Sequence, residues 1–171
     1  MLATLLQYKP DLQYQPNRRF NYCNTNFVLL ALIIEKVSGK TYADYLQQTF
    51  FSPLQMNHTK VFNWNDSASV TPSYMWNGTQ EAFTHLDLTY GDKNIYSTVT
   101  DLLKWDLALY DTLLFKQSTL DSAFRPYSFE KPGIHNYGLG WRMYTLPNDK
   151  KIIYHNGWWH GNNSTFYRVV T

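Results

Sequence analysis

The apolar stretch from Asn24 to Val37 constrains the fold of this chain most strongly. Its apolar side chains cover nearly the whole circumference of a helical wheel, and this pattern predicts a helix that is buried on all sides. Ser38-Gly39-Lys40 follows, and the glycine is suited to the left-handed conformation that ends many helices. At 171 residues, the chain is large enough to build a core around such a helix.

Three other helices are predicted, over residues 2–8, after Thr41 and after Thr98. An aspartate follows each threonine three residues later, which is the spacing of a capping box. Between the last two helices, residues 57–96 form a long segment without helical or strand periodicity. Segments of this length are uncommon in compact domains unless they cover a site or are disordered, and the many aromatic residues here favour an ordered cover.

The C-terminal part reads as antiparallel strands at 137–144, 151–158 and 164–170. Turn signals stand between them at Pro147-Asn148-Asp149 and Gly161-Asn162-Asn163. Helices come first and strands later, which predicts the α+β class. We expect one domain over 1–171, with mainly helices and long loops in 1–125 and antiparallel strands in 126–171.

Composition excludes several classes of protein. A hydrophobic content of 44% with only 16% charged residues excludes a disordered chain. The net charge is +2 and the longest basic runs are pairs, Arg18-Arg19 and Lys150-Lys151, so no nucleic-acid surface is expected. The histidines lack metal-ligand spacing, and the single Cys23 cannot form an internal disulfide.

Several motifs together resemble the serine β-lactamase-related family, which includes class C β-lactamases, D-alanyl-D-alanine peptidases and related esterases. Tyr22-Cys23-Asn24 and the helix after it resemble the family's Tyr-x-Asn segment, and GDKNIYSTVTDLLKW resembles the helix after its substrate-side loop. His155-Asn156-Gly157 stands where the family has a Lys-Thr-Gly or His-x-Gly triplet that binds substrate. The resemblance covers almost the entire chain. It implies the larger part of a β-lactamase/transpeptidase-like fold, incomplete at both ends.

The resemblance also implies a role for each of these residues. Enzymes of this family attack a carbonyl with a serine that is activated by a lysine three residues later, and they form an acyl-enzyme. Tyr22 would be a proton shuttle, because neighbouring cations favour its phenolate, and Asn24 would fix a substrate amide. His155 would take the position of the triplet's cation, and Gly157 would let the substrate backbone approach. The N–H of Trp158 would be one of two oxyanion-hole donors.

One part of the family pattern is missing from its expected place. The Ser-x-x-Lys motif should lie well upstream of Tyr-x-Asn, but only 21 residues precede Tyr22. The match Ser128-Phe129-Glu130-Lys131 comes after it, and with 10 Ser and 10 Lys roughly half a match is expected by chance. We interpret this match as coincidental. We expect the nucleophile in a longer parent protein, and no hydrolytic activity from these 171 residues alone.

Alternatives remain open at this point. Asn24 or Thr25 could cap the helix with Tyr22 packed against it, and His155 could be a hydrogen-bonded strand histidine. The parent could be a serine hydrolase of a β-lactam, a D-amino-acid peptide or an ester. It could instead be a non-catalytic relative that binds cell-wall-like ligands or a partner protein. A Ser-x-x-Lys motif upstream in the parent gene would favour the enzyme.

Partners and location follow from the resemblance in the same way. It implies a small-molecule or peptide substrate, no cofactor and no metal. It also implies a periplasmic, secreted or cell-envelope location. If neighbouring strands of the sheet lie outside the chain, an unpaired strand edge is expected to favour self-association.

Overall fold

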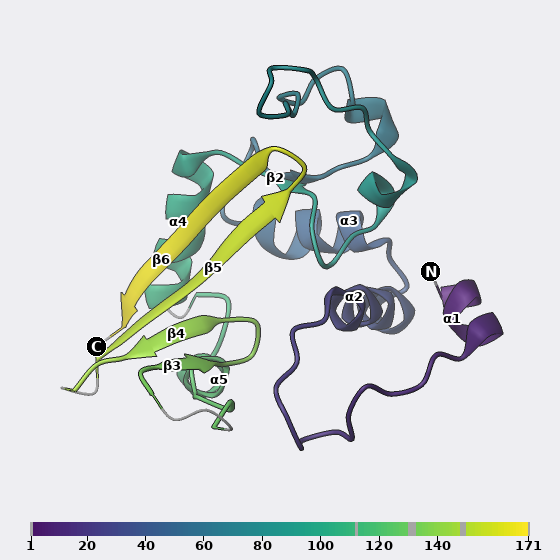
Figure 1. Ribbon diagram of the computed structural model, residues 1–171. Coiled ribbons are helices and arrows are strands. Elements are labelled where there is room, and N and C mark those ends of the chain that lie inside the picture. The colour runs from purple at the N-terminus through teal and green to yellow at the C-terminus, as the bar shows by residue number, and fades with distance from the viewer. Residues whose placement is uncertain (1, 112, 130–132, 148–149, 171) are drawn as a thin grey trace.

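The computed structural model describes residues 2–111, 113–129, 133–147 and 150–170. The helices are α1 (Leu2–Tyr8), α2 (Asn24–Ser38), α3 (Tyr42–Leu46), α4 (Val99–Tyr110) and α5 (Gln117–Ala123) (Figure 1). Shorter turns are a π-helical turn, η1 (Gln47–Phe51), and two 3-10 turns, η2 (Trp64–Asp66) and η3 (His85–Leu88). The strands are β1 (Lys60–Val61), β2 (Ile95–Tyr96), β3 (His135–Tyr137), β4 (Arg142–Thr145), β5 (Lys151–Trp159) and β6 (Asn162–Val170). The predicted α+β class is confirmed.

Local signals place the helix ends as the sequence predicts. The Thr41 hydroxyl accepts a hydrogen bond from the N–H of Asp44 at the start of α3, and Thr98 does the same for Asp101 at the start of α4. Gly39 ends α2 with a φ of 69°. Each of these caps satisfies backbone groups that a helix end leaves without a partner.

α2 is not buried on every side, so that prediction is wrong for the described chain. Val28 and Ala31 are buried, whereas Leu30, Ile33 and Val37 are 53%, 56% and 83% exposed. The described elements cover only one face of the helix. None of the described elements packs on the other face, which carries Leu30, Ile33 and Val37.

The sequence does not predict α5, which falls in a stretch that reads as a loop. Lys116 stands at its N-cap and makes no side-chain capping bond, so the usual start signal is absent. The single strand predicted over 137–144 is also wrong. The chain turns between β3 and β4, and Gly138 lies so close to α5 that an added Cβ would be 2.3 Å from the carbonyl oxygen of Ala123.

Two motif positions fall partly outside the described residues. The turn predicted at Pro147-Asn148-Asp149 includes 148–149, and the Ser128-Phe129-Glu130-Lys131 match includes 130–131. The other predicted turn lies where β5 passes into β6, at His160-Gly161.

β3 to β6 form an antiparallel sheet in the order β3-β4-β5-β6, with α4 and α5 packed on one face (Figure 1). Met143 and Ile153 are fully buried on that face. On the opposite face Tyr144, Tyr154 and Tyr167 stack across three strands, with ring centroids 5.0 and 4.5 Å apart. A second core joins α3, η1 and α4 through a cluster of buried residues, Leu46, Phe51, Leu54, Met56, Val61 and Ala108.

The long segment 57–96 is described throughout and contains short ordered elements. β1 lies near the start of this segment and β2 near its end, and the two strands pair with each other. The segment therefore leaves the helical core and returns to it. Near its end, Gly91 passes α2 with a φ of 93°. A Cβ there would lie 2.6 Å from the carbonyl oxygen of Phe27 and 2.8 Å from the Cβ of Ala31.

We therefore expect Gly91→Ala to destabilise the complete protein by about 1–3 kcal/mol, since a side chain adds both backbone strain and a clash with α2. Urea unfolding followed by circular dichroism measures the change. Gly78→Ala is the matched control, because Gly78 has a φ of 82° but nothing within 4 Å of an added Cβ. Equal losses for the two variants would show that the contact with α2 contributes nothing.

No helix of the described residues is long and apolar enough to span a bilayer.

Candidate active site

Tyr22 and Asn24 lie at the start of α2. The residue that caps this helix decides whether Asn24 is a capping residue or is free for another role. Cys23 is the N-cap, with an extended backbone and no capping bond from its side chain. Asn24 is already the first residue of the helix, and its side chain is exposed. The alternative in which Asn24 or Thr25 caps α2 is therefore wrong.

The structure brings Tyr22 next to His155, although the two come from opposite ends of the chain. Their rings are stacked with centroids 6.0 Å apart, and Tyr22 is 43% exposed. Tyr137 lies edge-on to Tyr22 at 6.3 Å. The guanidinium carbon of Arg142 lies 5.5 Å from the Tyr22 ring centroid and 6.0 Å from that of Tyr137. Tyr22 thus has a stacked histidine and a cation as neighbours.

The hydrogen bonds of His155 define its tautomer. Its Nδ1 lies 2.9 Å from the carbonyl oxygen of Asn156, which can only accept, so Nδ1 carries the proton. In the neutral ring Nε2 then accepts from the Tyr137 hydroxyl, 3.1 Å away. Burial lowers the pKa of His155, the Asn156 carbonyl opposes this, and Arg142 lowers the pKa further. Burial, followed by the effect of Tyr22, raises the pKa of Tyr137 to about 12, so this donor stays protonated.

This arrangement corrects one part of the sequence interpretation. His155 occupies the triplet position but is neutral near pH 7, because its pKa lies below the ordinary value of 6.5. Arg142 supplies the positive charge beside Tyr22 instead. No carboxylate of the described residues pairs with Arg142, whose side chain is exposed. Its guanidinium N–H groups are therefore available to an anionic ligand.

β5 offers an open edge at the triplet. β4 pairs only with Lys151 to Tyr154, whereas β6 pairs with all of β5. The Leu146 N–H bonds to the Lys150 carbonyl, so even-numbered residues of β5 direct their N–H groups toward β4 in this regular ladder. The N–H of Trp158 therefore points to the side that β4 leaves open. This is the side required of an oxyanion-hole donor.

The remaining triplet residues are exposed, as a substrate-binding edge requires. Asn156 faces solvent, and the Trp158 side chain is 83% exposed with its Nε1 donating to the His160 carbonyl at 3.0 Å. Gly157 lies close to the neighbouring strand, but only to a side-chain hydroxyl that can rotate away. A Cβ there would lie 2.6 Å from the hydroxyl of Ser164 on β6.

Two cavities adjoin this cluster, and Phe20 and Tyr137 line both. The first, of about 380 Å³, is mostly apolar and is lined by Tyr22, Cys23 and the start of α2. The second, of about 300 Å³, is lined by Arg142 together with Arg19 and His135. Neither is lined by the His155-Asn156-Gly157 triplet. The apolar cavity thus adjoins Tyr22, and the cationic cavity adjoins Arg142.

Tyr137 and Arg142 are the site residues that sequence reasoning misses. Both lie in YGLGWRMY, where they look like ordinary strand residues. Their position beside Tyr22 depends on the β3–β4 turn, which pairs Tyr137 with Arg142 across the two strands. The described residues contain no group of three or more histidine, cysteine, aspartate or glutamate side chains that could hold a metal ion.

Comparison with known proteins identifies the family of this chain. The family model described as Beta-lactamase matches residues 4–170. The chain belongs to the beta-lactamase family. Penicillin-binding protein 4* of Bacillus subtilis (strain 168) is 31% identical over 173 residues, which cover 92% of this chain and 38% of that protein. Teichoic acid D-alanine hydrolase of Staphylococcus aureus (strain NCTC 8325 / PS 47) is 27% identical and covers 88% of this chain and 37% of its own length.

A solved structure supports the fold of this beta-lactamase-family chain. The octameric penicillin-binding protein homologue from Pyrococcus abyssi superposes with a TM-score of 0.81 at 23% identity, over 98% of this chain and 40% of that one. The resemblance to a β-lactamase/transpeptidase-like fold is thereby confirmed. The chain spans less than two-fifths of the length of both curated relatives. The activity of the whole protein therefore does not follow from these comparisons alone.

Proposed function

We propose that this chain is part of a serine hydrolase that forms an acyl-enzyme on a D-amino-acid peptide or a β-lactam. The observation that carries this proposal is the meeting of Tyr22 with the open edge of β5, where the N–H of Trp158 points outward. A proton-relaying hydroxyl and an oxyanion donor on facing elements are what acyl transfer needs beside a nucleophile.

In the proposed reaction, a serine supplied by the rest of the protein adds to the substrate carbonyl, and its proton passes through the motif lysine and the Tyr22 hydroxyl to the leaving nitrogen. The carbonyl oxygen gains negative charge and accepts from the Trp158 N–H. Cleavage of the C–N bond, which releases the amine of a peptide but leaves the amine of a β-lactam attached to the acyl group, gives an acyl-serine. Water then adds to the ester carbon, gives up its proton along the same relay, and releases the acid and the serine.

Arg142 supports the choice of substrate class. Its guanidinium, with which no carboxylate of the described residues pairs, lies next to Tyr22 and on the wall of the second cavity. It suits a carboxylate, which arginine binds through two parallel N–H bonds. D-Amino-acid peptides and β-lactams both carry a carboxylate near the scissile amide. One relative is named for penicillin binding, which agrees with a β-lactam, and the other is named as a teichoic acid D-alanine hydrolase, which agrees with a D-amino-acid substrate. We also propose a cell-envelope location, because teichoic acid is a polymer of the bacterial surface.

Steady-state hydrolysis by the complete protein tests this proposal. Nitrocefin, a peptide ending in D-Ala-D-Ala, the L-Ala-L-Ala isomer and p-nitrophenyl acetate form the panel. Turnover of nitrocefin or the D-peptide, with the L-isomer much slower, is the expected result. Binding of these compounds in calorimetry without turnover of any of them would overturn the proposal in favour of a non-catalytic binding protein.

A further inference from the structure

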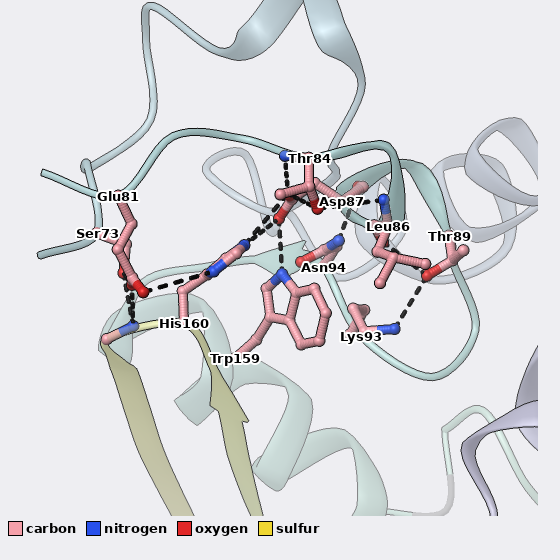
Figure 2. A network of polar contacts seen from close by, with 11 residues as sticks. Ser73, Glu81, Thr84, Leu86, Asp87, Thr89, Lys93, Asn94, Trp159 and His160 are labelled. Atoms are coloured by element: carbon pink, nitrogen blue, oxygen red, sulfur yellow. Dashed lines mark hydrogen bonds and ion pairs between the residues drawn. The ribbon is translucent and has the colours of Figure 1, made fainter. Parts of the chain in front are cut away.

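Asp87 is a buried carboxylate in the segment 57–96 that the reaction scheme above does not use. It is 2% exposed and lies in η3, where it accepts from the backbone N–H of Thr84 at 2.6 Å and from the Thr84 hydroxyl at 3.1 Å (Figure 2). Its other donors come from the end of β5. Trp159 Nε1 donates at 2.6 Å, and His160 Nε2 lies 3.0 Å from one oxygen and 3.2 Å from the other.

These hydrogen bonds keep Asp87 ionised. Burial would raise the pKa of Asp87, but the bonds from the Thr84 N–H, from Trp159 and from His160 outweigh burial and hold the pKa below its usual value. A carboxylate bonded in this way is a strong acceptor for all of its donors at once. Neutral replacements such as an amide cannot accept from every one of them.

Trp159 is fixed from a second direction. The Lys93 ammonium lies 4.5 Å from the centre of its ring system, and Lys93 is itself held by Asp92 and by the Thr89 hydroxyl at 3.0 Å. The indole is therefore bonded at its edge by Asp87 and covered on its face by a cation. Both groups belong to the segment 57–96.

The turn that follows is anchored to the same segment. The N–H of Gly161 lies 2.7 Å from both the Ser73 hydroxyl and the Glu81 carboxylate. A Cβ on Gly161 would be 2.1 Å from the carbonyl oxygen of Tyr74, so the two backbones are in close contact. His160, between the two anchors, adopts a φ of 52°.

The anchors matter because the strand has little other support there. Past Tyr154, β5 has no ladder partner other than β6 among the described residues, and the two strands run as a narrow ribbon toward the segment 57–96 (Figure 1). The facing residues of β6, 162–165, are exposed. Two-stranded ribbons are marginally stable in water, so the position of 155–160 depends on what holds the far end.

We propose that Asp87, acting through Trp159 and His160, is a positioning residue that holds the open edge of β5, and with it the Trp158 N–H, at the distance acyl transfer requires. This proposal rests on the proposed function for its effect on rate. The anchoring of β5 by Asp87 can be measured by amide exchange, without any measurement of turnover. Asp87 itself does not touch the reacting atoms.

The test uses Asp87→Asn in the complete protein, with two readouts. The first is hydrogen–deuterium exchange, in which amides of 155–161 are expected to exchange faster. The second is steady-state kinetics on the substrate that wild type turns over. There kcat is expected to fall about ten- to hundredfold with KM nearly unchanged, because an oxyanion donor acts mainly in the transition state.

Controls separate positioning from general destabilisation. Asp66→Asn removes a similar capping-box carboxylate in the same segment, which pairs with Lys60 and has no contact with β5 or β6 among the described residues. It should change neither readout. Trp159→Phe keeps a ring over Lys93 but loses the bond to Asp87, and the double variant with Asp87→Asn should be no slower than Asp87→Asn alone.

Unchanged exchange in 155–161 for both Asp87→Asn and Trp159→Phe would overturn the proposal, as would a rise in KM with kcat intact. Faster exchange at 155–161 in a protein whose wild type hydrolyses nothing would support the anchoring by Asp87 while removing the proposed function.

Discussion

Tyr22→Phe in the complete protein is expected to lower kcat by about two to four orders of magnitude, the range typical of removing a general acid–base group. The substitution keeps the ring that stacks on His155 and lies under Arg142, so the fold should be nearly unaffected. Only the hydroxyl is lost, and with it the proton relay between the serine and the leaving nitrogen. Stopped-flow or steady-state rates on the best substrate of the panel give the measurement.

Tyr8→Phe is the matched control for this experiment. Tyr8 is 72% exposed at the end of α1 and lines neither cavity beside the site, so its loss of a hydroxyl should leave kcat unchanged. A Tyr22→Phe enzyme with the full rate at neutral pH would make Tyr22 a packing residue.

Arg142→Ala is expected to lower kcat/KM for a peptide with a free C-terminal carboxylate by about one to two orders of magnitude, which corresponds to a charged hydrogen bond. The same peptide with an amidated C-terminus should lose far less, since it has no carboxylate for the guanidinium to bind. Arg142→Lys keeps the charge but loses the planar fork, so an intermediate loss is expected.

Comparing the peptide with a free C-terminal carboxylate and the amidated peptide also detects an indirect effect of Arg142→Ala on catalysis. Arg142 contacts the ring of Tyr22, and its removal could disturb that residue. Equal losses on the two peptides would mean that Arg142 acts through Tyr22, and would contradict its assignment to the substrate carboxylate.

Features encoded over a few residues are predictable from this sequence. Thr41 and Thr98 cap α3 and α4 because capping requires only a side chain and the next turn of backbone. Features that depend on distant partners are not. The exposure of Leu30 and Ile33 on α2 depends on which elements pack there, and the turn between β3 and β4 depends on the contact of Gly138 with α5.

The candidate site divides in the same way. Tyr22 and the His155 triplet carry a family pattern in the sequence, so they can be found there. The neutral state of His155 follows from burial and from the nearby charge of Arg142, which together outweigh the bond to the Asn156 carbonyl, and a linear sequence displays none of these. Arg142 takes over the charge only because β4 brings it beside Tyr22. Asp87 lies in the long segment without periodicity and Trp159 lies at the end of β5, so sequence spacing does not predict that the two residues meet.

Intact-mass analysis of the complete protein after brief exposure to benzylpenicillin tests the central proposal most directly. The account predicts a covalent adduct of the whole penicillin, which peptide mapping places on a serine outside residues 1–171, and which forms far more slowly in Tyr22→Phe. An adduct on Ser128, or no adduct with any β-lactam or D-amino-acid ester, would contradict it.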